Sequence, residues 1–209
     1  GKKYVDGNQL CHIKWLNDLE KDINLKSLKV ICEIGAGYGC FAEKFLRNTK
    51  SKYIIIDLPE ANFLSSYFLY KNLPNKKILL SNKINNSISS KEIKKYDIII
   101  MNPWHKILNI KVDLFINARS MMEMDYFVIK KYFDLIHKNL KTNGYFLNIN
   151  RYVKSTIGYP VEFSKYPYNK RWKVIKSNAS WNQNHIHLLL TKKIKSRGDI
   201  QSELKKINF

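Results

Sequence analysis

The sequence feature that most constrains the fold of this chain is a short apolar run that ends at closely spaced glycines. Residues Val30 to Ile34 have the length and apolar character of a buried parallel strand. Gly35, Gly37 and Gly39 follow and allow the backbone to turn tightly and to approach a ligand closely. Residues 40–48 then carry apolar side chains on one helical face. Strand, glycine loop and helix in this order predict an α/β fold with a ligand at the start of the helix.

The spacing of the glycines distinguishes two kinds of ligand. A dinucleotide-binding loop reads G-x-G-x-x-G, whereas this loop reads G-x-G-x-G and follows the acid Glu33. Glu33 would repel a pyrophosphate, so the loop suits a ligand with a cationic or hydroxyl-bearing part. The stretch resembles motif I of class I S-adenosylmethionine-dependent methyltransferases, which implies that Glu33 lies near the methionine part of S-adenosylmethionine. The resemblance implies that the cofactor is followed by Gly35, Ala36, Gly37, Tyr38 and Gly39.

A second acid, Asp57, tests this interpretation. It ends the apolar run 53–56 and lies eighteen residues after Gly39. A carboxylate at the end of the second strand can accept both hydroxyls of a ribose, and the usual spacing is about 20 residues. We expect Leu58 to lie against adenine and Pro59 to begin the next helix. Further cofactor contacts are predicted at the N-terminus and at strand ends, from Tyr4, Asn102, Pro103 and Asn117.

Length, charge and cysteine content bound the class of protein. The 209 residues suffice for one domain, and the chain contains no run of about 18 apolar residues that would predict a membrane span. We expect a single cytoplasmic domain over residues 1–209, with Cys11, Cys32 and Cys40 as reduced thiols. Lysines scattered along the chain supply most of the net charge of +20. This pattern favours a solvated basic surface or attraction of an anionic substrate over specific nucleic-acid binding.

The remaining segments alternate between helices and strands. The helix expected over residues 60–71 is apolar nearly all round, which predicts a second packing neighbour. Two runs, 77–80 and 97–101, compete for the third strand, and we favour the second because it is longer and ends at Asn102-Pro103. The stretch 81–90 is then a loop or an edge excursion. Other expected elements are a helix over 9–23, a helix over 126–140 that stops at Asn143-Gly144, and a loop at 152–170. Strands are expected at 112–117, 145–149, 172–175 and 185–190.

The last two expected strands have no helix between them and should form an antiparallel hairpin. The fold class predicted for the chain is therefore α/β, with a doubly wound, mostly parallel Rossmann-like sheet and an antiparallel last strand. Ligands of such sheets lie beyond the carboxyl ends of the parallel strands. Candidate functional residues are expected at that edge.

Transfer of a methyl group to a hydroxyl requires a base, because a hydroxyl is a weak nucleophile until it loses its proton. The candidates are Glu123 and His185, with His105 third. Equally, Glu123 can be a structural carboxylate paired with Arg119, and the histidines can be ordinary strand residues. The sequence contains no D-x-D or clustered acids, so no metal is expected. Expected substrate contacts are Arg151, Tyr152 and Trp181.

The segment FINARSMMEM, residues 115–124, is too polar for a plain strand–helix joint and occupies the position of motif IV. Together with EIGAGYG and with IIIDLPE at 54–60, it resembles the sugar O-methyltransferase family of bacterial surface-glycan gene clusters, over about Tyr4 to Leu190. The resemblance implies S-adenosyl-L-methionine as cofactor, S-adenosyl-L-homocysteine as product, and a sugar or glycan precursor of a capsular or other surface polysaccharide as acceptor. Family members are longer at the N-terminus, so we expect an acceptor-binding part to be missing here.

Two alternatives stay open. Asn102-Pro103-Trp104 resembles the N-P-P-aromatic motif of amino methyltransferases that act on nucleic acid or protein, but the second proline is absent and the motif precedes the strand that should carry it. A degenerate methyltransferase fold that serves as an interaction module is the non-enzymatic alternative. The intact Glu33, glycine loop and Asp57 argue against it.

Overall fold

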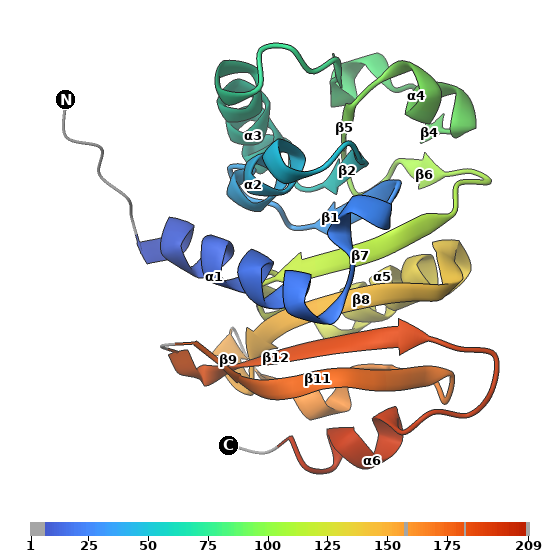
Figure 1. Ribbon diagram of the computed structural model, residues 1–209. Helices are drawn as coiled ribbons and strands as arrows, with labels where there is room; N and C mark the ends of the chain where they lie inside the picture. Colours follow the sequence, from blue (N-terminus) through green and yellow to red (C-terminus); the bar gives the residue numbers. More distant parts are fainter. Residues whose placement is uncertain (1–6, 157–158, 182, 208–209) are drawn as a thin grey trace. The chain divides into compact units, whose positions relative to one another are not determined.

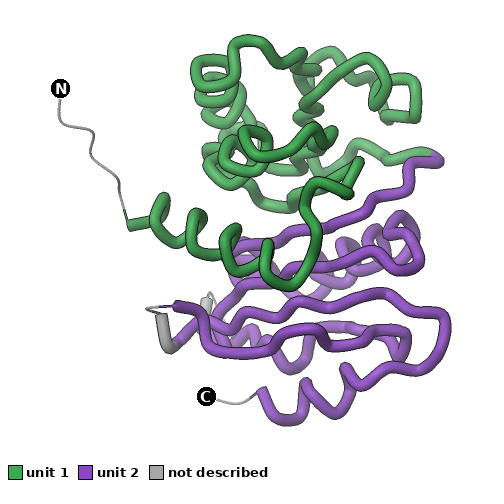
Figure 2. The backbone as a smooth tube through the Cα atoms, in the orientation of Figure 1, with its two compact units in different colours: residues 1–108 green, residues 109–209 purple. Residues whose placement is uncertain are grey.

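The computed structural model describes residues 7–156, 159–181 and 183–207. The chain divides into two compact units, residues 1–108 and residues 109–209 (Figure 2). Both units contain strands and helices (Figure 1). The predicted α/β class, with mostly parallel strand pairing and an antiparallel last strand, is confirmed. The single domain over residues 1–209 stays a prediction.

The first unit contains four parallel strands in the spatial order β1, β2, β5, β3. Their bounds are β1 Val30–Ile34, β2 Lys52–Ile56, β5 Ile98–Met101 and β3 Ile78–Leu79. The helices are α1 Gly7–Asp22, α2 Cys40–Asn48, α3 Pro59–Asn72 and α4 Ser90–Lys95. The shorter elements are η1 Leu25–Ser27, η2 Ser81–Lys83, β4 Ser87–Ile88 and β6 Lys106–Ile107. The side chains of β2 and β5 are almost wholly buried, which explains why both strands read as continuous apolar runs.

Both runs that competed for the third strand enter the sheet, and the favoured run takes the position beside β2, as predicted. β5, the favoured run, pairs with β2, and the shorter β3 pairs with the outer side of β5. An inner strand needs apolar side chains along its whole length, whereas two residues suffice for an edge. The stretch 81–90, expected as a loop or an edge excursion, contains η2 and β4. It ends in a capping box, in which Ser89 and Glu92 exchange hydrogen bonds at the start of α4.

The second unit contains β7 Val112–Ala118 and β8 Leu140–Arg151 as a parallel pair. β12 Gln183–Lys193 runs antiparallel to β8, and β11 Trp172–Ser180 runs antiparallel to β12. The predicted hairpin is therefore confirmed, although both strands are longer than expected. The other elements are η3 Met121–Glu123, α5 Tyr126–Asn139, β9 Val153–Thr156, β10 Tyr159–Glu162, η4 Phe163–Lys165 and α6 Ile200–Leu204.

Three features of the second unit differ from the sequence prediction. Helix α5 ends at Asn139, before the predicted stop at Asn143-Gly144, and Asn143 instead adopts a positive φ of 66° within β8. The segment after Arg151, predicted as a loop, forms the antiparallel hairpin β9–β10. Helix α6 was not predicted, because five residues are too few to display a helical period. Long periodic segments were thus predicted better than short ones.

None of the helices within residues 7–156, 159–181 and 183–207 has the length and apolar character needed to cross a bilayer. The three cysteines are free and buried. Burial raises the pKa of Cys32, which lies inside β1. These thiols are therefore structural side chains of the core.

Candidate functional site

The glycine loop after β1 is shaped by backbone conformations that favour glycine. Gly37 has a φ of 57° and Gly39 a φ of 87°, both in the left-handed region. A Cβ at Gly37 would meet no atom within 4 Å, so the backbone there borders open space. A Cβ at Gly39 would lie 3.2 Å from the side chain of Leu69, so the loop is pressed against α3 at this point. The loop therefore presents bare backbone on one side and packs closely on the other.

Asp57 lies directly beside this loop. Its Oδ2 accepts a hydrogen bond from the backbone N–H of Gly37 at 2.8 Å, and its Oδ1 accepts one from the N–H of Leu58 at 2.8 Å. A carboxylate has about four lone-pair sites, so the group can accept a further hydrogen bond beyond those from the backbone. Partial burial raises the pKa of Asp57, and hydrogen bonds from the backbone N–H groups of Gly37, Leu58 and Ala36 oppose that shift. The carboxylate is held in one orientation with acceptor capacity to spare.

The carboxyl ends of three neighbouring strands bring these residues together within the first unit. The N–H of Gly35 donates to the carbonyl of Ile56 at the end of β2, and the N–H of Asp57 donates to the carbonyl of Met101 at the end of β5. The glycine loop, Asp57 and Asn102 therefore follow one another along one sheet edge. This is the edge at which open α/β sheets bind ligands.

Glu33 is buried one residue before the end of β1 and is 2% exposed. The hydroxyl of Tyr53 donates a hydrogen bond to its Oε2 at 2.8 Å. Burial raises the pKa of Glu33 to about 8, and the negative charge of Asp57 adds to the rise. Glu33 is therefore largely protonated at neutral pH, and a cation brought near it would favour the ionised form.

Asn62, on the second turn of α3, joins the ends of β2 and β5. Its amide Nδ2 lies 2.8 Å from the carbonyl of Asp57, 3.1 Å from the carbonyl of Met101 and 2.9 Å from Oδ1 of Asn102. The residue is 2% exposed. Because this side chain contacts both strand ends, it holds Asp57 and Asn102 in register. The sequence analysis missed Asn62, for which the pattern of α3 carries no signal.

His105, the third candidate base, is engaged in its own turn. Its Nδ1 accepts a hydrogen bond from the N–H of Asn102 at 3.0 Å, so the proton of the neutral ring is on Nε2. Burial lowers the pKa of His105. Pro103 is exposed, and Trp104 is exposed beside the His105 ring. A neutral ring whose unprotonated nitrogen already accepts a backbone hydrogen bond is poorly arranged to take a proton from a substrate.

The other predicted cofactor residues of the first unit lie around this edge. Ala36 is partly buried, and the ring of Tyr38 packs edge-on against Phe68 of α3 at 5.1 Å between centroids. Leu58 is 59% exposed, which leaves its side chain available to a ligand. Tyr4 lies outside the described residues. The structure thus gathers most of the predicted cofactor residues into one place.

In the second unit, three buried asparagines hold the segment between β7 and α5. Oδ1 of Asn117 accepts from the N–H of Met121 at 3.1 Å and from Nδ2 of Asn150 at 2.8 Å. Asn150 in turn accepts from the N–H of Met122 at 3.0 Å and donates to Asn148 at 2.6 Å. All three asparagines are fully buried. Asn117 was predicted as a cofactor contact; its amide oxygen accepts two hydrogen bonds of this network, and the cofactor contact stays a prediction.

Arg119 leaves β7 with a φ of 63°, and its N–H donates to the carbonyl of Ile149 at 2.7 Å. The turn directs the chain into η3, where Glu123 is exposed. The carboxylate of Glu123 forms an ion pair with Lys154 of β9. The structural alternative considered for Glu123 was a pair with Arg119, so its ionic partner was predicted wrongly. A partly exposed ion pair opens readily, which leaves Glu123 available as a base.

The two histidines of β12 differ in their surroundings. His185 is exposed, and its carbonyl accepts from the N–H of Tyr152 at 3.1 Å. His187 is buried and lies between Oγ of Ser177 at 2.9 Å and the hydroxyl of Tyr152 at 3.1 Å. Burial lowers the pKa of His187 to about 4, so this ring is neutral at pH 7. Tyr152 is therefore held by β12 at two points, its backbone N–H by the carbonyl of His185 and its hydroxyl by the ring of His187.

The remaining predicted substrate contacts also lie in the second unit. Nε of Arg151 is buried and has no hydrogen-bond partner among the described residues. The indole of Trp181 is 47% exposed. Within the part of the chain that the structure describes, no three histidine, cysteine or acidic side chains gather as metal ligands would.

Comparisons with known proteins identify the fold. No family profile and no curated protein sequence matches this chain. Among solved structures, magnesium protoporphyrin IX methyltransferase from Synechocystis, crystallised with bound S-adenosylmethionine, matches with a TM-score of 0.61 over 92% of this chain and 86% of its own, at 11% identity. The chain has the class I methyltransferase fold.

Other proteins of this fold that match act on different atoms. The N-methyltransferase NodS from Bradyrhizobium japonicum matches with a TM-score of 0.60 over 91% of this chain and 100% of its own, at 14% identity. The mitomycin 7-O-methyltransferase matches with a TM-score of 0.58 over 89% of this chain, at 9% identity, and this chain spans 53% of that protein. The methyltransferase fold is common to O- and N-methyltransferases, so it does not select the acceptor.

Proposed function

We propose that the chain is an S-adenosylmethionine-dependent methyltransferase whose cofactor binds at the carboxyl ends of β1, β2 and β5. The observation that carries this proposal is the position of Asp57. Two backbone N–H groups orient its carboxylate beside a glycine loop that borders open space. A carboxylate held in this way suits a pair of ribose hydroxyls.

The residues present fit the rest of the cofactor. Glu33 offers a buried carboxyl group to a cationic methionyl part, and Leu58 offers an exposed apolar side chain to adenine. When bound, the cofactor supplies an electrophilic methyl group on a sulfonium. The chain has to bind it, exclude water and orient the acceptor. Asn62 contributes by keeping the strand ends of Asp57 and Asn102 in register.

For the acceptor we propose a hydroxyl of a sugar or glycan precursor of a bacterial surface polysaccharide. The proposal rests on the resemblance of the glycine loop, the Asp57 segment and residues 115–124 to the sugar O-methyltransferase family. The net charge of +20 and the unpaired Nε of Arg151 favour an acceptor that carries an anionic group. Glu123 and His185 are the candidate bases, because both are exposed and His105 is engaged by Asn102.

The amino methyltransferase alternative gains little support from Asn102. The strand that ends at Asn102, β5, pairs with β2 and β3. Asn102 therefore follows the strand beside Asp57, on the ribose side of the proposed cofactor site. Its Oδ1 accepts from Asn62 and its N–H donates to His105, so both groups already have partners. An acceptor amine could donate only to the second lone pair of this Oδ1.

Calorimetric titration with S-adenosylmethionine and S-adenosylhomocysteine tests the cofactor proposal. Asp57→Ala should weaken binding by about 1.5 to 3 kcal/mol, or roughly tenfold to a hundredfold, the range for hydrogen bonds to a charged group. Asp97→Ala is the matched control, because Asp97 precedes the opposite end of β5 and pairs with Lys52. Its stability can fall while its cofactor affinity stays that of the parent. No binding by the parent, or equal affinity in Asp57→Ala, would refute the proposal.

The acceptor is tested separately. Sugar nucleotides and lipid-linked glycan precursors would be incubated with the chain and methyl-labelled cofactor, and the products analysed by mass spectrometry. A mass increase of one methyl on a saccharide supports the proposal. Transfer of label to an amine of protein or nucleic acid, with none to saccharides, would favour the amino methyltransferase alternative.

A further inference from the structure

The outer face of α3 combines large apolar side chains with exposure to solvent. Phe63 is 74% exposed, Leu64 57%, Tyr67 64% and Tyr70 68%. The sequence predicts a second packing neighbour for this helix, and among the described residues this face has none. Its inner face packs, since Leu69 is fully buried. A contiguous exposed patch of this kind marks an interaction surface.

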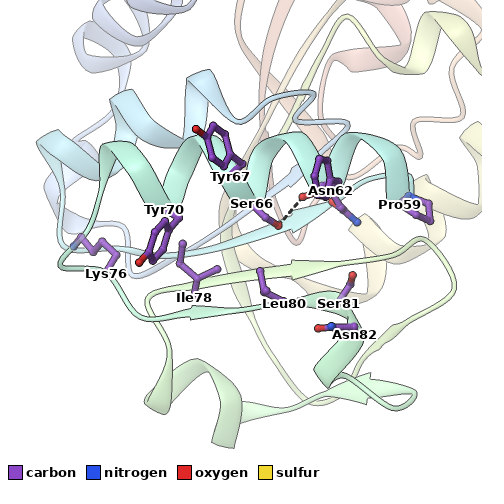
Figure 3. Close-up of a pocket in the computed structure, with 11 residues that line it drawn as sticks. Pro59, Asn62, Ser66, Tyr67, Tyr70, Lys76, Ile78, Leu80, Ser81 and Asn82 are labelled. Atoms are coloured by element: carbon purple, nitrogen blue, oxygen red, sulfur yellow. Dashed lines mark hydrogen bonds between the residues drawn. The ribbon is translucent and has the colours of Figure 1, made fainter.

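A groove lies along the same face. It has a volume of about 650 Å³ and runs between α3 and the segment around β3 (Figure 3). Tyr67 and Tyr70 line one side, and Ile78 and Leu80 line the other (Figure 3). Bulky side chains of a partner could enter between these two walls. Tyrosine and other aromatic residues are enriched at the centres of protein interfaces.

Charge distinguishes α3 from the rest of the chain. The chain has 37 lysines and arginines, yet the 14 residues of α3 include one base, Lys71, and one acid, Glu60. Depletion of charge is typical of the core of an interface. The two charges lie at opposite ends of the helix, the acid in the first turn and the base in the last.

The spacing of four side chains makes this face complementary to itself. Glu60, Leu64, Tyr67 and Lys71 follow one another at steps of four, three and four, which aligns them along one side of the helix. Nζ of Lys71 lies 5.8 Å from the centroid of the Tyr67 ring, so both side chains share this side. If a second α3 is laid antiparallel on the first, Glu60 meets Lys71 of the second copy and Leu64 meets its Tyr67. The helix dipoles are then antiparallel as well.

We propose that two copies of this chain associate about a two-fold axis through an antiparallel pair of α3 helices. The two central Leu64–Tyr67 contacts supply apolar burial, and the two Glu60–Lys71 pairs select the antiparallel orientation. Phe63 and Tyr70 flank the seam beside the groove. The occupant is a second copy of this chain, because an antiparallel α3 necessarily places a base opposite Glu60 and an acid opposite Lys71. An unrelated partner need not do so. A net charge of +20 on each copy opposes association, so the dimer should have a dissociation constant of about 1 to 100 µM.

Sedimentation velocity at near-physiological salt tests the proposal over about 1 to 300 µM chain. The parent should pass from monomer to dimer within this range. Glu60→Lys and Lys71→Glu should each weaken dimerisation about tenfold or more, because each places like charges opposite one another twice. The matched controls are Glu20→Lys on α1 and Lys130→Glu on α5, which make the same changes in net charge at exposed positions of other helices. Both should dimerise as the parent does, within about threefold.

The decisive result is rescue. The double variant Glu60→Lys/Lys71→Glu restores opposite charges across an antiparallel pair and should dimerise within about threefold of the parent, as should an equimolar mixture of the two single variants. Tyr67→Lys should abolish dimerisation in the same range. A parent that stays monomeric to about 300 µM overturns the proposal. So does a dimer that is indifferent to Tyr67→Lys, or a double variant as weak as the single ones.

Discussion

Replacing Glu33 by glutamine should remove a pH dependence of stability that this one buried carboxyl group creates. In the folded chain the pKa of Glu33 is raised from its ordinary value of 4.5 to about 8, chiefly by burial. In the unfolded chain the side chain is solvated and has its ordinary pKa. The folded state therefore binds one more proton than the unfolded state between these two values. The stabilising contribution is complete below about pH 4.5 and is lost as the pH rises through about 8.

The size of the effect follows from the two pKa values. Each pH unit between them removes about 1.4 kcal/mol of stability, and the slope flattens near the upper value. Between about pH 6 and about pH 8 the parent should lose about 2 kcal/mol from this group alone. Glutamine has no charge to desolvate, and its side-chain carbonyl can accept the hydrogen bond from Tyr53 that Glu33 accepts now. The variant should therefore lack this loss.

Urea unfolding of both chains at the two pH values measures the effect. Other titrating groups are common to both chains, so they cancel in the difference between parent and Glu33→Gln. That difference should move by about 2 kcal/mol in favour of the variant as the pH rises. Glu92→Gln is the control, because hydrogen bonds from Ser89 lower the pKa of Glu92 and keep it ionised across the interval. A Glu33→Gln difference constant to within about 0.5 kcal/mol would refute the reasoning.

Three further predictions concern the proposed cofactor and the chemistry. A bound cation should favour ionised Glu33, so the affinity of the parent for S-adenosylmethionine should rise by up to about tenfold per pH unit from about pH 6 to 8. The affinity of Glu33→Gln should not change with pH over this interval, and titration calorimetry distinguishes the two outcomes. Gly37 has a φ of 57°, so Gly37→Ala should cost about 1 kcal/mol of stability and should lower cofactor affinity. Gly7→Ala, at the start of α1, should do neither. Thermal unfolding with and without cofactor measures both effects. Of Glu123→Gln and His185→Gln, the one that removes the base should lower turnover about 10²- to 10⁴-fold with cofactor affinity unchanged. Parent turnover in both variants would exclude both residues as the base.

Local patterns along the chain predicted the parts of the site that depend on near neighbours. A strand, a glycine loop and a helix are adjacent in sequence, and the spacing from Gly39 to Asp57 spans one strand–helix–strand unit. Such a unit has few ways to pack, so Glu33, the loop and Asp57 could be foreseen together. Their meeting is observed in the hydrogen bond from Gly37 to Asp57.

What the sequence could not supply are contacts between residues far apart in the chain. Three such features depend on which segments meet in three dimensions. They are the position of β5 between β2 and β3, the hydrogen bond from Asn62 to Asn102, and the asparagine network of residues 117, 148 and 150. Polar side chains such as these have no period that reveals their partners. The same is true of Glu123, whose partner Lys154 comes from a hairpin too short and too polar to predict.

The sequence by itself determined the class of fold and the cofactor half of the proposed site, because apolar periodicity and glycine spacing are patterns of residues that are close together in the chain. Only the tertiary structure decided how those residues are ionised and held. Burial of Glu33 raises its pKa to about 8, and the N–H of Asn102 occupies the ring nitrogen through which His105 could act as a base. Likewise, only the structure leaves the apolar face of α3 exposed. Desolvation and long-range hydrogen bonding arise from packing, and packing exists only once the chain is folded.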